Sequence, residues 1–514
     1  MSGAKSIMFL GTGSDVGKSV LAAAFCRILR NEGYRVAPFK AQNMALNSFI
    51  TPQGGEMGRA QVVQAEAAGI EPHVDMNPIL LKPTSQMGSQ VIVLGRAIGN
   101  FSAASYYEYK KELVSVVRSA FERLSAQNDL IVIEGAGSAV ELNLKSHDLV
   151  NMAMAEMADA KCILVGDIDR GGIFASLLGS YSLLAPSERN RIVGFIVNKL
   201  RGDPRLFEDG VKILQERSGV PVLGVVPYFQ DISLSEEDSV ALGRRMAAKR
   251  GEAVREAVRV GVVRLPFISN YTDFDPFESD PRVELVYFDR PAEIFGFDAV
   301  IIPGSKNTIE DLDALRKTGM ADVLSAFYKS GGVVVGLCGG YQMMGSVVRD
   351  PHGVESSIEV IPGLGLLDME TEMYTEKTTS QVRAGVLCDS LPFPVRQEEL
   401  HGYEIHMGRS VSGGMAKPIF RIAQRDGKPA DIEDGLSQPD GRAWGTYIHG
   451  IFDNDGFRNM FLEDIARRSG KVVSTLSDAF SFRLWKEEQY ERLAALVREH
   501  VDVARLLDAV MGKN

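Results

Sequence analysis

Residues 333–345 read Val-Val-Val-Gly-Leu-Cys-Gly-Gly-Tyr-Gln-Met-Met-Gly. This stretch is the starting point for interpreting the second half of the chain. Val333–Val335 is a short apolar, β-branched run, which predicts a buried strand. The run continues through Cys338, which is followed by two glycines, into a predicted helix at Tyr341–Val348. A strand that turns tightly into a helix at a reactive residue with small neighbours is typical of a nucleophile elbow. Cys338 is therefore the candidate nucleophile, and the alternative is a buried cysteine without a chemical role.

Two turns are candidates for stabilising an oxyanion beside this cysteine. Gly339 directly follows Cys338, so its N–H group can face a charge that develops on a substrate oxygen. The predicted strand Ala299–Pro303 ends at Gly304, one strand–helix unit earlier, where a second donor is expected. We predict that the backbone N–H groups of Gly339 and of Gly304, or of its neighbour Ser305, form the oxyanion hole.

A cysteine nucleophile needs a base, and five of the seven histidines follow Cys338. His449 lies in a strand-like run at 445–452, so we expect it at a strand tip, and it is the favoured base. The segment His401–Arg409 alternates like a strand, which predicts a ligand-contacting edge. In that segment Tyr403 and Glu404 are candidate substrate contacts.

The first half of the chain begins with a phosphate-binding pattern. Ser6–Leu10 is an apolar run that predicts a buried strand, and a glycine-rich loop and an amphipathic segment follow. Glycines let backbone N–H groups converge on phosphates, a lysine reaches their oxygens, and a hydroxyl at the helix N-terminus can ligate Mg²⁺. The alternative is a turn that binds nothing. The predicted ATP-binding residues are Gly11, Thr12, Gly13, Ser14, Asp15, Val16, Gly17, Lys18 and Ser19.

Acidic residues at strand ends are candidates for the metal. Leu130–Ile133 predicts a strand that ends at Glu134, and a carboxylate there can hold Mg²⁺ opposite the phosphate loop together with Ser19. Asp167 and Asp169 follow the next predicted strand, and the sequence does not choose between them.

The polar loop after the predicted strand Arg35–Phe39 is a candidate substrate site, because open parallel sheets bind ligands at the carboxyl ends of their strands. Its candidate residues are Lys40, Gln42, Asn43 and Asn47. Gln61 and Gln64 belong to the predicted helix Gly58–Gly69, where amides are more often solvated than functional.

The composition excludes several classes of protein. The net charge of −11 argues against nucleic acid or an anionic membrane as the main partner. Cys26, Cys162, Cys338 and Cys388 occur singly, so neither a disulfide framework nor a structural zinc site is indicated. We find no signal peptide and no apolar stretch near the ~18 residues of a membrane span, and we expect a cytoplasmic protein.

Strands alternate with helices in both halves of the 514 residues, which predicts an α/β protein. The expected parts are an N-terminal P-loop domain with a doubly wound parallel sheet at 1–231 and a charged linker at 232–257. A C-terminal α/β domain at 258–456, which resembles a glutaminase in its Cys338, Gly304 and His449 segments, and a helical extension at 457–514 follow.

Family resemblances sharpen these interpretations. The loop at 11–19 resembles the dethiobiotin-synthetase-like branch of P-loop proteins, and the Cys338, Gly304 and His449 segments resemble class I glutamine amidotransferases. The fused arrangement resembles the corrinoid amidotransferases over nearly the whole chain. The resemblance implies that L-glutamine and ATP are substrates and that Mg²⁺ is a cofactor. It also implies that Asn198 lies where adenine is recognised. The segments 40–48 and 401–409 resemble those of one group of corrinoid amidotransferases. The members of this group amidate the b, d, e and g carboxylates of adenosylcobyrinic acid a,c-diamide, a corrinoid.

The chain departs from the triad pattern at one position. The residue two after the histidine is usually Glu in class I amidotransferases and is Ile451 here. The acid that orients His449 is therefore missing or is supplied elsewhere, and Glu404 and Asp453 are the candidates.

Three alternatives remain open. Cobyrinic acid a,c-diamide synthase shares the two-domain plan, although the amide-rich loop at 41–48 argues against it. Another P-loop glutamine-dependent ligase is the second. The third is not an enzyme: a ParA/MinD-like ATPase switch with an inactive glutaminase domain.

Overall fold

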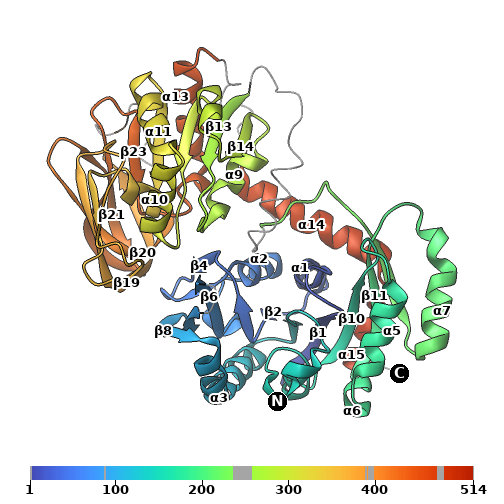
Figure 1. Ribbon diagram of the computed structural model, residues 1–514. Helices are drawn as coiled ribbons and strands as arrows, with labels where there is room; N and C mark the ends of the chain where they lie inside the picture. The colour runs from blue at the N-terminus through green and yellow to red at the C-terminus, as the bar shows by residue number, and fades with distance from the viewer. Residues whose placement is uncertain are drawn as a thin grey trace. The chain divides into compact units, whose positions relative to one another are not determined.

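The structure is a computed structural model, and it describes residues 3–85, 88–235, 257–387, 391, 399–471 and 480–512 (Figure 1). The chain forms two compact units. The first comprises 1–45, 56–235 and 486–514, and the second comprises 46–55 and 236–485. Cys388 and residues 236–256 of the expected linker lie outside the described residues.

The first unit is built on a six-stranded parallel sheet. Its order is β12 (Val222–Pro227), β11 (Ile192–Leu200), β10 (Lys161–Asp167), β1 (Lys5–Gly11), β9 (Leu130–Glu134) and β2 (Val36–Phe39). Ile7–Leu10 of the central strand β1 are fully buried, as expected for a parallel sheet covered on both faces. The doubly wound P-loop sheet expected from the sequence is thus confirmed.

Helices and a small second sheet complete this unit. The helices are α1 (Lys18–Asn31), α2 (Arg59–Ala68), α3 (Ala103–Gln127), α4 (Met152–Met157), α5 (Ile173–Leu183), α6 (Pro186–Arg189), α7 (Glu208–Ser218), most of α14 (Phe482–His500) and α15 (Val503–Met511). A four-stranded sheet consists of β3 (Gln42–Met44), β6 (Ile79–Ser85), β7 (Gly88–Val93) and β8 (Arg96–Ser102), and β5 (Glu56–Gly58) precedes α2. Leu493 and Leu506 of the C-terminal helices belong to the same core as Ile7, so the end of the chain packs beside its first strand (Figure 1).

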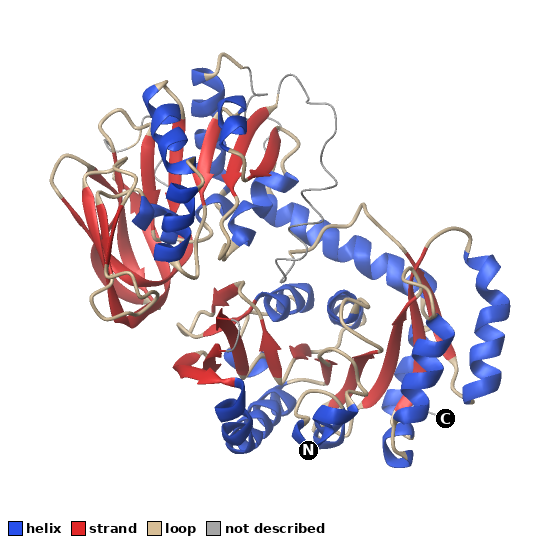
Figure 2. Cartoon of the chain, in the orientation of Figure 1, coloured by secondary structure: helices blue, strands red, loops and turns tan. Residues whose placement is uncertain are grey.

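The second unit is organised around an eleven-stranded sheet. Its parallel part has the order β14 (Val283–Phe288), β13 (Val258–Val263), β15 (Ala299–Ile302), β16 (Val333–Leu337) and β23 (Ala443–Thr446). Antiparallel strands continue from β23: β22 (Lys428–Ser437), β21 (Lys417–Arg425), β19 (Met369–Val386) and β20 (Leu400–Ser412), and β17 (Val347–Arg349) and β18 (Val360–Pro362) complete the sheet. Figure 2 shows helices among the parallel strands and long strands without helices in the antiparallel part.

The helices of this unit flank the parallel strands. They are α9 (Asp275–Ser279), α10 (Thr308–Lys317), α11 (Met320–Lys329), α12 (Gly339–Met343) and α13 (Asp455–Arg468), and β4 (Ser48–Ile50) also belongs to the unit. Val333–Val335 are buried in β16. An aromatic cluster in the core of the unit consists of Trp444, Phe452, Phe457 and Phe461.

Two local expectations from the sequence were wrong. The helix after Cys338 ends at Met343, because β17 begins at Val347 and pairs with β19. The loop at 41–48 contains β3 and the start of β4, so its polar residues lie on short strands. The helical extension ends in α14 and α15, which are separated at Val501–Asp502, where the Asp502 side chain caps α15 by accepting from the N–H of Arg505.

Among the described residues, none of the helices combines the length and apolar character that crossing a membrane requires.

Candidate functional sites

The phosphate loop is held from behind by Asn198. Its Nδ2 donates to the carbonyl oxygen of Val16 at 2.9 Å. Gly17, the N-cap of α1, has φ 102°, and a Cβ there would lie 2.0 Å from that same Nδ2. Only glycine fits this left-handed position beside the asparagine. The loop between β1 and α1 is thus preformed, with backbone N–H groups at the N-terminus of α1 as expected for anion binding.

Lys18 is buried within this loop. Its Nζ donates to the carbonyl oxygens of Gly13 at 2.8 Å and Gly137 at 2.9 Å. Burial lowers the pKa of Lys18 to about 8, against the opposing charge of Glu134. A buried ammonium group on a glycine loop is suited to neutralising phosphate charge.

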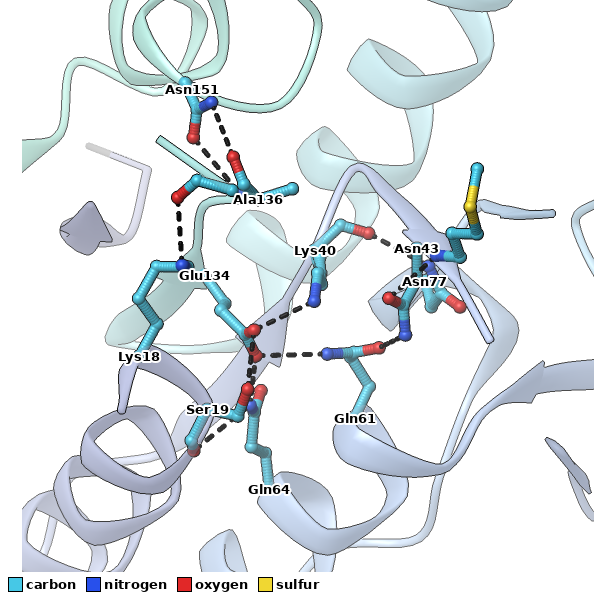
Figure 3. Close-up of polar contacts among 12 residues, drawn as sticks. Lys18, Ser19, Lys40, Asn43, Gln61, Gln64, Asn77, Glu134, Ala136 and Asn151 are labelled. Atoms are coloured by element: carbon cyan, nitrogen blue, oxygen red, sulfur yellow. Dashed lines mark hydrogen bonds and ion pairs between the residues drawn. The ribbon is translucent and has the colours of Figure 1, made fainter. Parts of the chain in front are cut away.

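Glu134 is the centre of a buried polar network at the end of β9 (Figure 3). Oε1 accepts from Ser19 Oγ and from Lys40 Nζ, each at 2.8 Å, and Oε2 accepts from Gln64 Nε2 at 2.6 Å. Burial opposes ionisation of Glu134, but the charge of Lys40 and these hydrogen bonds outweigh it and hold the pKa below its ordinary value. The structure therefore brings Ser19 and Glu134, the two expected metal-binding residues, into direct contact.

The amides of α2 extend this network. Gln61 Nε2 lies 3.4 Å from Glu134 Oε2, and Gln61 Oε1 accepts from Asn43 Nδ2 at 3.0 Å. The expectation that Gln61 and Gln64 are solvated was wrong, because both are buried against Glu134. The glutamate needs these donors, since an ionised carboxylate is costly to bury unless its oxygens are hydrogen-bonded.

The other polar residues of this half have separate partners. Gln42 accepts from the hydroxyl of Tyr106 at 2.6 Å. Asp167 pairs with Lys199 and Asp169 with Arg201, at 2.8 and 2.5 Å. Over the described ranges, no cluster of three or more His, Cys, Asp or Glu side chains is arranged to hold a metal ion.

In the second unit, four neighbouring parallel strands lead into the residues of a second site. Asn270 and Asp273 follow β13, Gly304 follows β15, Cys338 follows β16, and His449 follows β23. Because parallel strands have their carboxyl ends at one edge of a sheet, these residues meet although they are far apart in sequence.

Cys338 occupies a strained turn between β16 and α12. Its φ of 50° and ψ of −108° are unusual for a residue with a side chain. Its N–H donates to the carbonyl of Thr446 at 2.8 Å, and its Sγ donates to the carbonyl of Ile405 at 3.5 Å. A strained backbone at a cysteine between a strand and a helix is the geometry expected of a nucleophile elbow.

His449 is fully buried and hydrogen-bonded to an acid that the sequence did not identify. Its Nδ1 lies 2.6 Å from Oδ2 of Asp273, whose Oδ1 accepts from the N–H of Gly450 at 2.9 Å. Burial lowers the pKa of His449, but Asp273 and Cys338 outweigh it and raise that pKa to about 10. The candidates from the sequence were Glu404 and Asp453; Glu404 instead pairs with Arg425 at 2.7 Å. Asp273 was missed because we considered only acids after Cys338, although strand-end reasoning applied to β13 would have included it.

The two glycine turns approach each other closely. A Cβ at Gly339 would lie 2.9 Å from the backbone nitrogen of Ser305, and one at Gly304 would lie 3.3 Å from Cε1 of His449. The space at Gly340 is smaller still, since a Cβ added there would lie 2.0 Å from the carbonyl oxygen of Ile302. The absence of side chains at these positions lets the turn after β15 and the start of α12 meet beside Cys338.

Gln342 and Tyr403 also lie near the reactive pair. Gln342, one turn after Cys338, accepts from Thr308 Oγ1 at 2.9 Å and donates to the Tyr447 hydroxyl at 3.3 Å. The ring of Tyr403 stacks on that of His449, with centroids 5.2 Å apart. Asn47, a further candidate, is fully buried in the second unit.

Comparison with known proteins agrees with this arrangement. Residues 7–241 match the CobQ/CobB/MinD/ParA nucleotide binding domain, and residues 259–457 match the CobB/CobQ-like glutamine amidotransferase domain. The chain is 71% identical over 503 residues to the cobyric acid synthase of Syntrophobacter fumaroxidans, covering 98% of both chains. It is 49% identical over 523 residues to that of Desulfitobacterium hafniense, covering 100% of this chain and 99% of that one. The non-enzyme alternative is thereby set aside. The chain belongs to the cobyric acid synthase family and is an enzyme with a nucleotide-binding domain and a glutamine amidotransferase domain.

Proposed function

We propose that this chain is a glutamine-dependent, ATP-hydrolysing amidotransferase that amidates the b, d, e and g carboxylates of adenosylcobyrinic acid a,c-diamide. The product is adenosylcobyric acid, an intermediate of cobalamin biosynthesis. The observation that carries this proposal is the 71% identity, over 98% of both chains, to a protein named cobyric acid synthase. The two polar sites described above supply chemistry suited to the two halves of such a reaction.

In the glutaminase half, the Cys338 thiolate would attack the side-chain carboxamide of glutamine. His449 would receive the thiol proton and deliver it to the departing ammonia, and Asp273 would hold the imidazole in the required tautomer. The backbone N–H groups of Gly304 and Gly339 would stabilise the oxyanion. Water would then hydrolyse the thioester and release glutamate.

In the synthetase half, the glycine loop at 11–17, Lys18 and Ser19 would hold the phosphates of ATP, and Asn198 would contact adenine. Ser19 and Glu134 would hold Mg²⁺, directly or through water. The metal would neutralise phosphate charge when the γ-phosphoryl group passes to a substrate carboxylate. The small donor set fits an ion that is bound mainly through phosphates and water.

Lys40, Gln42, Asn43, Asn47, Tyr403 and Glu404 are the proposed substrate-contacting residues. Lys40 is the strongest of them, because its ammonium group lies at the Glu134 network where a second anion would be neutralised. Ammonia would attack the phosphorylated carboxylate, giving the amide, ADP and phosphate.

We propose the functional division 1–231 for the synthetase, 232–257 for the linker, 258–456 for the glutaminase and 457–514 for a helical extension. The grouping of 486–514 with the first compact unit supports a packing role for the end of that extension. A cytoplasmic location would give the enzyme access to ATP and glutamine.

Separating the two half-reactions tests this function. Cys338→Ala should abolish glutamine hydrolysis and glutamine-dependent amidation but retain amidation with ammonium salts. Lys18→Ala should retain glutamine hydrolysis and lose amidation with either nitrogen source. Loss of both reactions in both correctly folded variants, as judged by circular dichroism, would contradict two separate sites.

A further inference from the structure

The two oxygens of the Glu134 carboxylate have different neighbours (Figure 3). Oε1 accepts from the hydroxyl of Ser19 and from the ammonium group of Lys40. Oε2 accepts from amides of helix α2: from Gln64 Nε2 at 2.6 Å and, over a longer distance, from Gln61 Nε2 at 3.4 Å. The carboxylate and both amides are buried. Glu134 therefore turns one oxygen toward the phosphate loop and the other toward α2.

A directional chain of hydrogen bonds fixes the amide of Gln61. An ionised carboxylate can only accept, so Gln61 turns its NH₂ group toward Glu134 and its oxygen away. That oxygen accepts from Asn43 Nδ2 at 3.0 Å, and Asn43 Oδ1 accepts in turn from the backbone N–H of Met44 at 2.9 Å. A backbone N–H can only donate, so each amide in this chain has one allowed orientation.

Gln64 has the same donor role and, in addition, an unused acceptor. Its Nε2 donates to Glu134 and lies 3.5 Å from the carbonyl oxygen of Ser19. Its Oε1 is buried and has no hydrogen-bond partner among the residues that the structure describes. Buried acceptors of this kind are rare in folded proteins, so this oxygen calls for a donor from a ligand. A water molecule held by a cation at Ser19 and Glu134 would be such a donor.

The amides on Oε2 determine how Glu134 can bind a metal. With Oε2 engaged, Oε1 is the oxygen that an ion at the phosphate loop can reach. Ser19 can ligate that ion through a lone pair while its hydroxyl still donates to Oε1, and Lys40 can turn away on its flexible stem. Ca²⁺ takes more oxygen ligands than Mg²⁺ and often both oxygens of a carboxylate, whereas Mg²⁺ demands an octahedron and keeps several waters. A site with a single carboxylate oxygen therefore suits Mg²⁺.

We propose that Gln64, with Gln61 as a weaker partner, restricts Glu134 to one metal-binding oxygen and thereby makes the nucleotide site select Mg²⁺ over Ca²⁺. Both glutamines are positioning residues, because they act on the ion through Glu134 or through a water that the ion holds. This inference rests on the proposed function, since it deepens the assignment of Ser19 and Glu134 to the metal.

Binding of the non-hydrolysable analogue AMP-PNP to the full-length enzyme tests the inference without turnover. Isothermal titration calorimetry in Mg²⁺ and in Ca²⁺ should show tighter binding with Mg²⁺ for the unmodified enzyme. Gln64→Leu removes the stronger donor and exposes Oε2 to Ca²⁺, so the preference for Mg²⁺ should fall by ~10-fold. Gln61→Leu should lower it less, because its contact with Glu134 is longer. Gln127→Leu, at the exposed end of α3, is the matched control and should leave the preference unchanged.

The ratio of the two affinities separates positioning from a general loss of structure, because a damaged fold weakens binding with both ions alike. An unchanged preference in Gln64→Leu, or an unmodified enzyme without a preference for Mg²⁺, would overturn the inference and leave the proposed function standing. If Gln64→Leu does not fold, as judged by circular dichroism, Gln61→Leu decides by the same criterion. Binding of AMP-PNP to the unmodified enzyme that depends on neither metal would overturn the metal site of the proposed function, and this inference with it.

Discussion

Nδ1 of His449 and Oδ2 of Asp273 lie 2.6 Å apart, although 176 residues separate them in sequence. The pair completes a Cys338–His449–Asp273 arrangement in which the acid comes from the segment that follows β13, and not from the position two residues after the histidine. Asp273 also accepts from the N–H of Gly450, so the same carboxylate fixes both the ring and the backbone that carries it.

Replacing Asp273 should impair glutamine hydrolysis selectively. Asp273→Asn removes the charge that raises the pKa of His449, while burial continues to lower it, so the imidazolium formed in the reaction loses its partner. We expect glutamine hydrolysis to fall ~10²–10⁴-fold. Steady-state assays should show that amidation with ammonium salts is retained, and an equal loss with ammonia would argue against an orienting role.

The same substitution should change how stability depends on pH. The pKa of His449 rises from 6.5 to about 10 on folding, so the protonated ring stabilises the native state. This contribution is fully present below pH 6.5 and is lost as the pH rises through 10. Urea unfolding should therefore show a stability difference between the unmodified enzyme and Asp273→Asn that is largest below pH 6.5 and shrinks above pH 10. A difference that grows with pH would contradict the assigned ion pair.

Glu134 should be required only for the synthetase half. Glu134→Gln keeps the side chain's size but removes the charge that binds Lys40 and would hold the metal. We expect amidation with either nitrogen source to fall by ~10–100-fold or more, with basal glutamine hydrolysis preserved. Glu208→Gln, at the exposed start of α7, is the matched control and should have no effect. Full activity of Glu134→Gln would refute the site.

Gly340 should tolerate no side chain. In Gly340→Ala the new Cβ would lie 2.0 Å from the carbonyl oxygen of Ile302, so α12 must move away from β15. Overpacking of this kind costs ~1–3 kcal/mol of unfolding free energy, and the displaced oxyanion turn should lower glutamine hydrolysis as well. Gly385→Ala in β19 is the control, because its Cβ would meet nothing within 4 Å. Thermal unfolding that is identical for the two variants would contradict the proposed close approach.

The sequence predicted the parts of the molecule that depend on local patterns. The glycine loop before Lys18 and the turn at Cys338 were recognisable because each follows an apolar strand and carries its reactive residue within a few positions. The strands that lead into these two motifs, and those that end near Phe39, Glu134 and Gly304, were predicted for the same reason, apart from boundary shifts of a few residues.

The missed features depend on contacts between distant segments. Asp273 and Asn270 reach His449 only because β13 and β23 lie in the same parallel sheet, and no spacing along the chain encodes that neighbourhood. In the sequence, Gln61 and Gln64 look like solvated amides on a helix. They are needed as hydrogen-bond donors because Glu134 is buried beside them. The early end of α12 follows from the pairing of β17 with β19, which a helical pattern in the sequence cannot show.

The central claim is most directly tested by mass spectrometry of adenosylcobyrinic acid a,c-diamide incubated with the enzyme, MgATP and glutamine. The account predicts stepwise exchange of carboxyl OH for NH₂, which lowers the mass at each step and continues to four substitutions, and no product with Cys338→Ala. An unmodified corrinoid, in the presence of intact glutamine hydrolysis, would contradict the proposed substrate.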